Sequence, residues 1–445
     1  MARRKDAGSI LSLLSEDTTA ALWIRRVGPF LEKVAVLGRK RAPALAESCE
    51  RSLEAWADAI RAELDPGDFL SGEAVVAFGD PGGLVTKVTR ALLSRDAPAF
   101  SLADFPILFA CRSSRAQELL EKVRVLAGKK GIRNEARETA GGPIICLHLG
   151  EKQQSPRSEH EAPPRGTSSA LHLAARDGLF LVSTSRPFLE ASMAGPGGGK
   201  SILESGLEDA GDGDLVFRAS AKLLKREIEA AVTGTYLAFP WREVTARLPA
   251  EALGFSLFLE ESRIRLRFSV RCPERAAGGE GFPPGLPSGD PRGADAFVTT
   301  ACEPERLAEI LDLLVRPIST REDGKEGPVY RLDRGPLAGA MLRLAGRSLL
   351  VSGPAAASGG VVPSGERPDF QAIFPPRVSL AGWASGSFVR SSVGALAEKG
   401  MGADLDDAGR AALRSAADAL DALTIHGSWR EKTFWGDLVL SLRQN

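Results

Sequence analysis

A pattern that occurs twice in this chain limits its fold more strongly than its composition does. Residues 105–123 read FPILFACRSSRAQELLEKV, and residues 296–314 read AFVTTACEPERLAEILDLL. Aligning Cys111 with Cys302 sets the offset at 302 − 111 = 191 positions. Each copy starts with a strand-like apolar run and continues with apolar residues three and four apart, which indicates a helix. The sequence therefore predicts an internal repeat.

The similarity continues downstream in segments that indicate β-hairpins. GGPIICLHL (141–149) matches EGPVYRLDR (326–334). LHLAARDGLFLVS (171–183) then matches LRLAGRSLLVS (342–352) with one gap. Short apolar runs separated by a tight turn, marked here by Gly or Arg, are typical of antiparallel strand pairs.

A second strand–helix element recurs three times, as AALWIRRVGPFLEKV (20–34), DLVFRASAKLLKREI (214–228) and LAGWASGSFVRSSVGAL (380–396). Alternation in RIRLRFSVR (263–271) predicts one solvated sheet face and one face packed on helices. The predicted fold class is α+β, with mainly antiparallel sheets packed on helices. The chain is expected to comprise about two and a half copies of one unit. Within a unit the elements follow the order strand, helix, helix, hairpin, strand, helix, hairpin, and consecutive elements are expected to lie side by side.

Stretches rich in Gly and Pro divide these units. GPGGG follows residue 194, and GPAAASGGVVPSGERP follows residue 352. Such compositions are typical of flexible connections. The predicted organisation is a first unit at 1–194, a linker and helix start at 195–212, a second unit at 213–352, a linker at 353–377, and a third, partial unit at 378–445.

Composition excludes some function classes. Lys+Arg and Asp+Glu both number 57 in 445 residues, so the formal net charge is zero and no basic footprint of a nucleic-acid binder is present. The five cysteines form no CxxC pair, which excludes a zinc ribbon or a thioredoxin-type motif. We interpret these cysteines as small buried hydrophobic residues.

The N-terminal sequence does not fit an export signal. Its apolar run ILSLL is five residues long, whereas a signal peptide needs roughly 7–15 apolar residues. No stretch approaches the roughly 20 apolar residues of a membrane-spanning helix. As written, the chain is expected to be cytoplasmic. The alternative is the periplasm or cell envelope, if a leader or anchor is missing.

Three segments resemble an uncharacterised bacterial family, a domain of unknown function built from repeated α+β units. They are LLSEDTTAALWIR (13–25), FPILFACRSSRAQELL (105–120) and DGLFLVSTSRPFLEAS (177–192). Members of this family usually carry an N-terminal signal or a membrane anchor, so the resemblance implies a location outside the cytoplasm. It implies no activity and no site residue, because none is established for the family.

AGPGGGKS (194–201) is close to a phosphate-binding loop. In a nucleotide enzyme, Gly199 and its neighbours would cradle phosphates, Lys200 would reach the terminal phosphate and Ser201 would hold Mg²⁺. That site requires a buried strand running into the loop, whereas SRPFLEASMA before it indicates a helix. The favoured interpretation is a Gly-rich linker followed by Ser201 as an N-cap, with Glu204 completing a capping box.

Other candidate sites are weaker. GDPGG (79–83) follows a strand but lacks the spacing and the lysine of a nucleotide loop. Cys146 and His148 share one strand face, and His172 on a neighbouring strand would complete a Cys-His-His metal site. No fourth ligand is fixed by the sequence, so no metal site is predicted. Ser385 in GWASGS lacks the first glycine of a nucleophile elbow, and the acidic run 208–214 lacks the bidentate Glu of a calcium loop.

These observations favour a non-catalytic binding or scaffold protein of unknown ligand, with the cell envelope as a candidate location. No cofactor is expected, and the partner is an unidentified protein or an apolar ligand, with an oligomeric state that the sequence leaves open. One alternative is a P-loop nucleotide hydrolase that uses AGPGGGKS. The other is a carrier that holds an apolar ligand between sheet and helices.

Overall fold

The chain forms two compact units. The computed structural model describes residues 10–41, 72–79, 106–152, 169–194, 213–222, 225–226, 229, 250–272, 294–300, 303–324, 327–333, 338–353, 374, 378–399, 414–415, 417–430 and 432–443. The first unit comprises Met1–Glu32 and Cys49–Glu227, and the second comprises Lys33–Ser48 and Ile228–Asn445. The predicted linkers at 195–212 and 353–377 lie almost entirely outside the described residues, so the predicted boundaries stay predictions.

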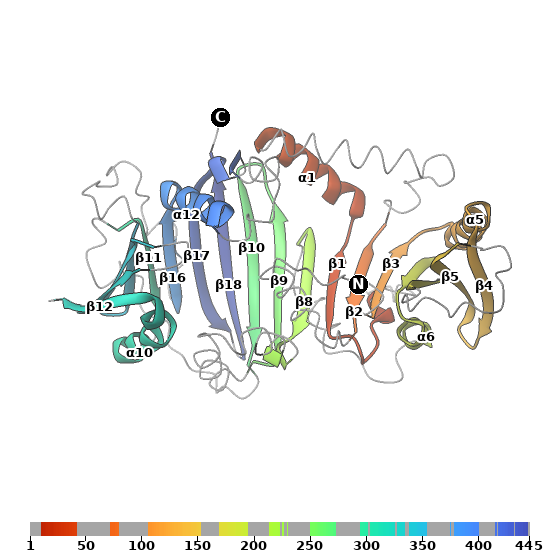
Figure 1. Ribbon diagram of the computed structural model, residues 1–445, viewed down its shortest axis with the longest axis horizontal. Coiled ribbons are helices and arrows are strands. Elements are labelled where there is room, and N and C mark those ends of the chain that lie inside the picture. Colours follow the sequence, from red (N-terminus) through yellow and green to blue (C-terminus); the bar gives the residue numbers. More distant parts are fainter. Residues whose placement is uncertain are drawn as a thin grey trace, which may run out of the picture. The chain divides into compact units, whose positions relative to one another are not determined.

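The first unit contains one antiparallel sheet with the strand order β8-β1-β2-β3-β7-β6-β5-β4 (Figure 1). Its strands are β1 Ala20–Ile24, β2 Ala74–Phe78, β3 Ile107–Arg112, β4 Ile132–Thr139, β5 Gly142–Lys152, β6 Ser169–Arg176, β7 Leu179–Ser183 and β8 Leu215–Ser220. Its helices are η1 Ile10–Leu13, α5 Ala116–Lys129 and α6 Arg186–Ala194, and α1 Val27–Arg41 starts in this unit.

The second unit contains an antiparallel sheet with the strand order β9-β10-β18-β17-β16-β11-β15-β14-β13-β12. Its strands are β9 Ala252–Leu259, β10 Arg263–Arg271, β11 Ala296–Thr300, β12 Ser319–Gly324, β13 Gly327–Leu332, β14 Met341–Ala345, β15 Ser348–Ser352, β16 Leu380–Ser385, β17 Leu420–Arg430 and β18 Thr433–Leu442. Its described helices are α10 Pro304–Val315, η3 Arg316–Ile318 and α12 Gly386–Lys399.

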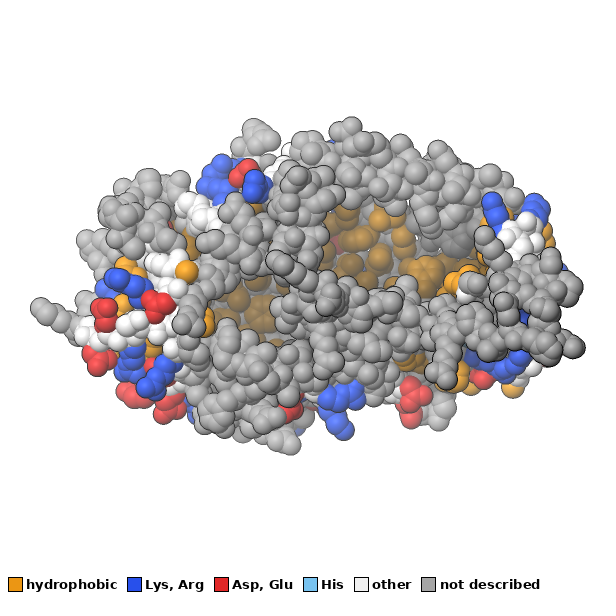
Figure 2. Space-filling model, viewed as in Figure 1, with side chains coloured by type: hydrophobic (Ala, Val, Ile, Leu, Met, Phe, Trp, Pro, Cys, Tyr) orange, Lys and Arg blue, Asp and Glu red, His pale blue; other side chains and the backbone are white. Residues whose placement is uncertain are grey.

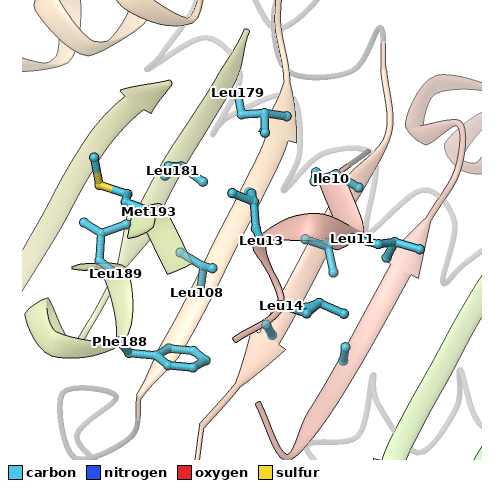
Figure 3. Close-up of a cluster of buried hydrophobic side chains, with 14 of the residues drawn as sticks. Ile10, Leu11, Leu13, Leu14, Leu108, Leu179, Leu181, Phe188, Leu189 and Met193 are labelled. Carbon is cyan, nitrogen blue, oxygen red and sulfur yellow. The ribbon is translucent and has the colours of Figure 1, made fainter. Parts of the chain in front are cut away.

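Helices cover both faces of the first sheet. On one face, Leu11 of η1 and Leu189 of α6 pack with Leu108 and Leu181 of the strands (Figure 3). On the other face, Leu119 of α5 packs with strand side chains in a second cluster. Alternate residues of a strand point to opposite faces, so the buried run LFLVS of β7 supplies both clusters. Apolar runs without alternation are expected where a sheet is buried on both sides.

The same strand order occurs once in each unit. β3-β7-β6-β5-β4 in the first unit and β11-β15-β14-β13-β12 in the second have matching pairings. A helix, α5 or α10, follows the first strand of each run. We call these runs the first and second five-strand modules. They contain the aligned segments of the predicted repeat, whose status as a repeat stays a prediction.

The prediction of an α+β fold built from helix-packed units is wrong. Of the part of the chain that the structure describes, 51% lies in strands and 29% in helices, so the fold is dominated by antiparallel sheet. The sheet also contains strands that have no apolar alternation and that the sequence pattern does not indicate, such as IRNEARET of β4 and STREDG of β12. These strands each pair with one neighbour, and backbone hydrogen bonding forms them without a buried side-chain face.

Candidate functional site

The predicted phosphate loop lies outside the described residues, so Gly199, Lys200 and Ser201 keep the status of a prediction. The segment before it is described. Helix α6 ends at Ala194, the first residue of AGPGGGKS, and β7 before it ends at Ser183. A helix therefore precedes this loop, as the sequence predicts, whereas a phosphate loop follows a strand directly.

The structure brings together the residues of the predicted Cys-His-His site. Cys146 of β5 lies directly opposite His172 of β6, and its Sγ is 3.7 Å from His148 Nε2. Glu135 of β4 adds a carboxylate whose Oε1 is 3.9 Å from the same nitrogen. Among the described residues, however, no group of three or more His, Cys, Asp or Glu is arranged to hold a metal ion.

This cluster is also poorly suited to nucleophilic catalysis. Burial, and then the charge of Glu135, raises the pKa of the Cys146 thiol. Burial, and then the nearby Arg186 guanidinium, lowers the pKa of His172. The two shifts favour the neutral thiol of Cys146 and the neutral imidazole of His172, whereas cysteine nucleophiles use a thiolate–imidazolium pair.

Two other candidates have structural roles. Ser385 is buried at the end of β16, and its Oγ accepts a hydrogen bond from the backbone N–H of Phe388 at 3.2 Å. It therefore caps helix α12. Gly79, the first residue of GDPGG, donates its N–H to the carbonyl of Pro106 at 2.8 Å, and residues 80–83 lie outside the described part. Neither residue presents a reactive group to a ligand.

One face of the second sheet carries only apolar side chains over four adjacent strands. Cross-strand register places these side chains together, because β9, β10, β18 and β17 are neighbours and alternate residues share a face. We call this surface the apolar face. It consists of Leu253, Phe255, Leu257 and Leu259 of β9, Ile264, Leu266, Phe268 and Val270 of β10, Leu423, Ile425 and Trp429 of β17, and Phe434, Leu438 and Leu440 of β18.

The apolar face is aromatic toward one end of its strands. The rings of Phe268 and Phe434 have centroids 6.0 Å apart, and those of Trp429 and Phe434 are 5.2 Å apart in a T-shaped arrangement. Glycines lie beneath these rings. A Cβ on Gly436 would be 2.2 Å from Phe268, and one on Gly427 would be 2.5 Å from Phe434. The glycines let the rings lie flat on the sheet, which widens the continuous hydrocarbon surface.

None of the side chains of the apolar face is buried. All are partly exposed, and Phe255 reaches 39%. Figure 2 shows hydrophobic side chains in a hollow over β10 and β18, whereas the charged side chains visible around the second sheet lie at its margins, for example over α10 and β12. A contiguous apolar surface of this kind normally marks a place where another molecule binds.

The opposite face of the same strands carries charged side chains among the apolar Phe258, Val439 and Trp435. Arg267 Nε lies 3.1 Å from Asp437 Oδ1, and the Arg265 guanidinium lies 4.2 Å from the Phe258 ring centroid. His426 Nε2 is 3.8 Å from Asp437, but burial lowers the pKa of this histidine despite the neighbouring carboxylate. Within the paired register of these four strands, the charges are therefore confined to one side of the sheet.

The alternation of β10 is visible in its sequence, RIRLRFSVR, from which its apolar side was expected to pack on helices. The overlooked signal was the length and uniformity of the pattern. β17 and β18 continue the same alternation over 11 and 10 residues. Trp23 of β1 and Trp383 of β16 are buried, with 8% and 5% of their surface exposed. Trp429 instead contributes to the partly exposed apolar face.

Comparison with known proteins assigns no family. No protein-family model matches the sequence, and no curated protein matches it. Among solved structures, it resembles crystal forms of TP0453, a Treponema protein of unknown function. Form I is 8% identical with a TM-score of 0.29, covering 80% of this chain and 97% of TP0453. Form III is 11% identical with a TM-score of 0.30, covering 80% and 98%.

Likeness at this level assigns no function to the chain. In the part of the chain that the structure describes, no helix is long and apolar enough to cross a membrane.

Proposed function

We propose that this chain is a non-catalytic binding protein and that the apolar face of the second unit holds an apolar ligand. The observation that carries the proposal is the absence of any polar or charged side chain among the residues of that face, all of which remain partly exposed. Covering exposed hydrocarbon contributes about 25 cal/mol per Å² of apolar surface, so a hydrocarbon ligand gains affinity along its whole length.

A hydrocarbon ligand fits this face better than a protein partner does. Non-obligate protein interfaces are only about as apolar as the rest of a protein surface, and they carry about one hydrogen bond per 100–200 Å². The side chains of the apolar face offer no hydrogen-bonding group apart from the indole N–H of Trp429. Small-molecule sites are lined mainly by aliphatic and aromatic side chains, as this face is.

Binding of an uncharged fluorescent hydrocarbon, diphenylhexatriene, tests the proposal directly. Phe255→Lys places a charge in the middle of the β9 edge of the apolar face, and Phe255 is exposed enough for the fold to tolerate the change. We expect the affinity for the probe to fall about tenfold or more, since burying a phenyl group contributes about 1.5–3 kcal/mol. Circular dichroism checks that the variant is folded.

A matched control separates this face from general surface hydrophobicity. Leu31 of α1 is 41% exposed and Val125 of α5 is 47% exposed, and neither belongs to the apolar face. Leu31→Lys and Val125→Lys should leave probe affinity within about twofold. Equal losses in all three variants, or no binding to the unmodified protein, would reject the apolar face as the ligand site.

The two other functions considered from the sequence have separate tests. A P-loop hydrolase requires Mg²⁺-ATP to raise the melting temperature in a manner that Lys200→Ala abolishes. A scaffold requires a defined complex with a second protein. A melting curve that ATP and GTP leave unchanged removes the first, and a chain that stays monomeric and captures no partner counts against the second.

A further inference from the structure

The apolar face is divided into two halves of different chemistry. The register of β9, β10, β18 and β17, which lie side by side in this order (Figure 1), arranges its residues in four rows across the strands. Two adjacent rows contain every aromatic side chain of the face, together with two aliphatic residues and two glycines. We call these two rows the aromatic half, and its aromatic members are Phe255, Phe268, Phe434 and Trp429.

The other two rows are entirely aliphatic, and we call them the aliphatic half. The row beside the aromatic half consists of Leu257, Leu266, Leu438 and Ile425, and the row beyond it contains only leucine and isoleucine as well. Neighbouring strands lie about 4.8 Å apart, so each row extends over about 14 Å. The aliphatic half is therefore large enough to cover a flexible hydrocarbon chain but offers it no ring.

The rings of the aromatic half already pack against one another. The centroids of Phe268 and Phe434 are 6.0 Å apart, and those of Trp429 and Phe434 are 5.2 Å apart. Both distances lie in the range of about 4.5–7 Å over which aromatic rings attract each other. Gly436 and Gly427 are buried beneath these rings, whereas the rings themselves remain partly exposed. A further ring can join this cluster in the same geometry.

We propose that the ligand of the apolar face has an aromatic ring at one end and an aliphatic chain at the other. This inference rests on the proposed function. In the bound state the ring packs against Phe434 and Trp429 in the aromatic half, and the chain covers Leu266 and Leu438 in the aliphatic half. A chain without a ring would also cover hydrocarbon, but it would lack the attraction between rings that adds to the burial of area.

Three hydrocarbons of twelve carbon atoms test the inference. 1-Phenylhexane has an aromatic ring, hexylcyclohexane has a saturated ring on the same chain, and dodecane has no ring. Each is titrated against protein-bound diphenylhexatriene, whose loss of fluorescence gives the affinity of the competitor. We expect 1-phenylhexane to bind about two- to tenfold more tightly than the other two, because ring pairs attract beyond the effect of area. Burial of apolar area alone would not favour it, since the saturated compounds carry more hydrogen atoms and expose no less surface.

Substitutions in the two halves locate the ring. Phe434→Leu and Phe255→Leu each replace a ring of the aromatic half by an aliphatic side chain, and each should reduce the preference for 1-phenylhexane over hexylcyclohexane. Phe255 is 39% exposed, so the fold is expected to tolerate its variant. The matched control is Leu257→Ala, in the aliphatic half of the same strand. It should weaken all three hydrocarbons by a similar factor and leave the preference unchanged.

Tryptophan fluorescence tests the orientation of the ligand separately. A bromine atom quenches an indole that it contacts. Bromine on the ring of 1-phenylhexane should therefore quench the protein more strongly than bromine at the end of its chain. Trp429→Phe keeps a ring at this position and should remove the difference. Equal quenching by the two bromides would overturn the proposed orientation.

The outcomes separate the two proposals. If diphenylhexatriene binds and Phe255→Lys weakens it, but the three hydrocarbons compete equally, the inference about the ring is wrong and the proposed function stands. Tighter binding of hexylcyclohexane or dodecane also overturns the inference, as does a preference for 1-phenylhexane that survives both leucine variants. If neither the probe nor any hydrocarbon binds, the proposed function fails as well.

Discussion

The hydrophobic faces of the two sheets differ in how far they are buried. In the first unit, Leu108 and Leu181 are fully buried, and packed helices lie on both faces of the sheet. In the second unit, Leu257 and Leu438 belong to an equally apolar face, yet each remains partly exposed. Alternation along a strand thus decides which side chains share a face, whereas burial depends on what packs over that face.

A second difference separates the two five-strand modules. Ile145 of β5 is a buried apolar residue, whereas the aligned Tyr330 of β13 is buried with a hydroxyl group. Tyr330 donates that hydroxyl to Asp312 Oδ1 at 2.7 Å, and Arg321 Nη1 donates to Asp312 Oδ2 at 2.5 Å. The same strand position therefore supports hydrocarbon packing in one module and a polar network in the other.

Leucine truncation provides the largest test of the difference in burial. Leu181→Ala should lower the free energy of unfolding by about 2–5 kcal/mol, because it leaves a cavity in a closed core. Leu438→Ala should cost about 1 kcal/mol, since a partly exposed leucine gives up only part of the 1.5–3 kcal/mol of full burial. Urea denaturation, with hydrogen exchange of peptides from each unit, measures both.

Similar costs for the two leucine variants would contradict the difference in burial. An acyl chain added to the apolar face provides the complementary experiment. The bound acyl chain should increase the loss of unfolding free energy caused by Leu438→Ala and leave the loss caused by Leu181→Ala unchanged. The reason is that only Leu438 is expected to contact the chain.

Replacing a glycine in each of the two aligned hairpins should have the next largest effect on the free energy of unfolding. Gly142 has φ 114° and Gly327 has φ 134°, so both have backbone conformations that favour glycine. A Cβ on Gly142 would meet only Met193 at 4.0 Å, whereas one on Gly327 would lie 2.3 Å from the Leu344 carbonyl oxygen. Gly142→Ala should cost about 1–3 kcal/mol from strain alone, and Gly327→Ala should cost more.

Urea midpoints measured for the two alanine variants decide this comparison. A Gly327→Ala protein as stable as the Gly142→Ala protein would show that Leu344 moves away without cost. The control is Gly128→Ala in α5, where φ is not positive and a Cβ meets nothing within 4 Å. Alanine should stabilise that position by about 0.5–1 kcal/mol.

Local features of the sheets were predictable from the sequence, but the covering of their faces was not. The pair Asp177-Gly178 joins β6 and β7 with positive φ at both residues, which confirms the tight turn that ARDGLF predicts. The strand and helix at 105–123 are also present as β3 and α5. The apolar side of β10 was assigned to helix packing because alternation does not show whether a helix lies over a strand.

The candidate site shows the same limit. Phe255 and Trp429 are 174 positions apart (429 − 255 = 174), and only the β9–β10–β18–β17 pairing brings them onto one face. No local motif encodes such a site, because its residues come from strands that meet only through the sheet. The segment AGPGGGKS (194–201) is the opposite case. Its motif is local and easy to recognise, but helix α6 precedes it where a phosphate loop requires a strand.

Alkaline pH should affect the stability of the second five-strand module, which contains Tyr330, but not that of the first, which has Ile145 at the aligned position. Burial, and then the hydrogen bond to Asp312, raises the pKa of Tyr330 from 10.0 to about 12. The folded protein thus retains the phenolic proton at pH values where the unfolded chain loses it. This contribution to stability is complete below pH 10 and is lost as the pH rises toward 12.

Tyr330→Phe isolates this contribution. At pH 8 the variant should be less stable by about 1–3 kcal/mol, because the hydrogen bond to a charged group is lost. The difference between the two proteins should shrink at pH 11, as measured by urea denaturation at each pH. A difference that stays constant from pH 8 to 11 would show that the phenol titrates alike in the folded and unfolded chains.

Helix surfaces give the smallest expected difference between the modules. Arg115 Nη2 lies 2.8 Å from Glu118 Oε2 in α5, and both side chains are largely exposed. The aligned Arg306 and Glu309 of α10 form no ion pair in the described structure of that helix. Glu118→Gln should therefore cost about 0.3 kcal/mol at low salt and nothing in 1 M salt, where screening removes the attraction. Glu309→Gln should show no salt-dependent cost, and urea midpoints at both ionic strengths measure the two variants. Equal salt dependence would mean that the surface charges of the two helices act alike, so that the modules differ only in their buried residues.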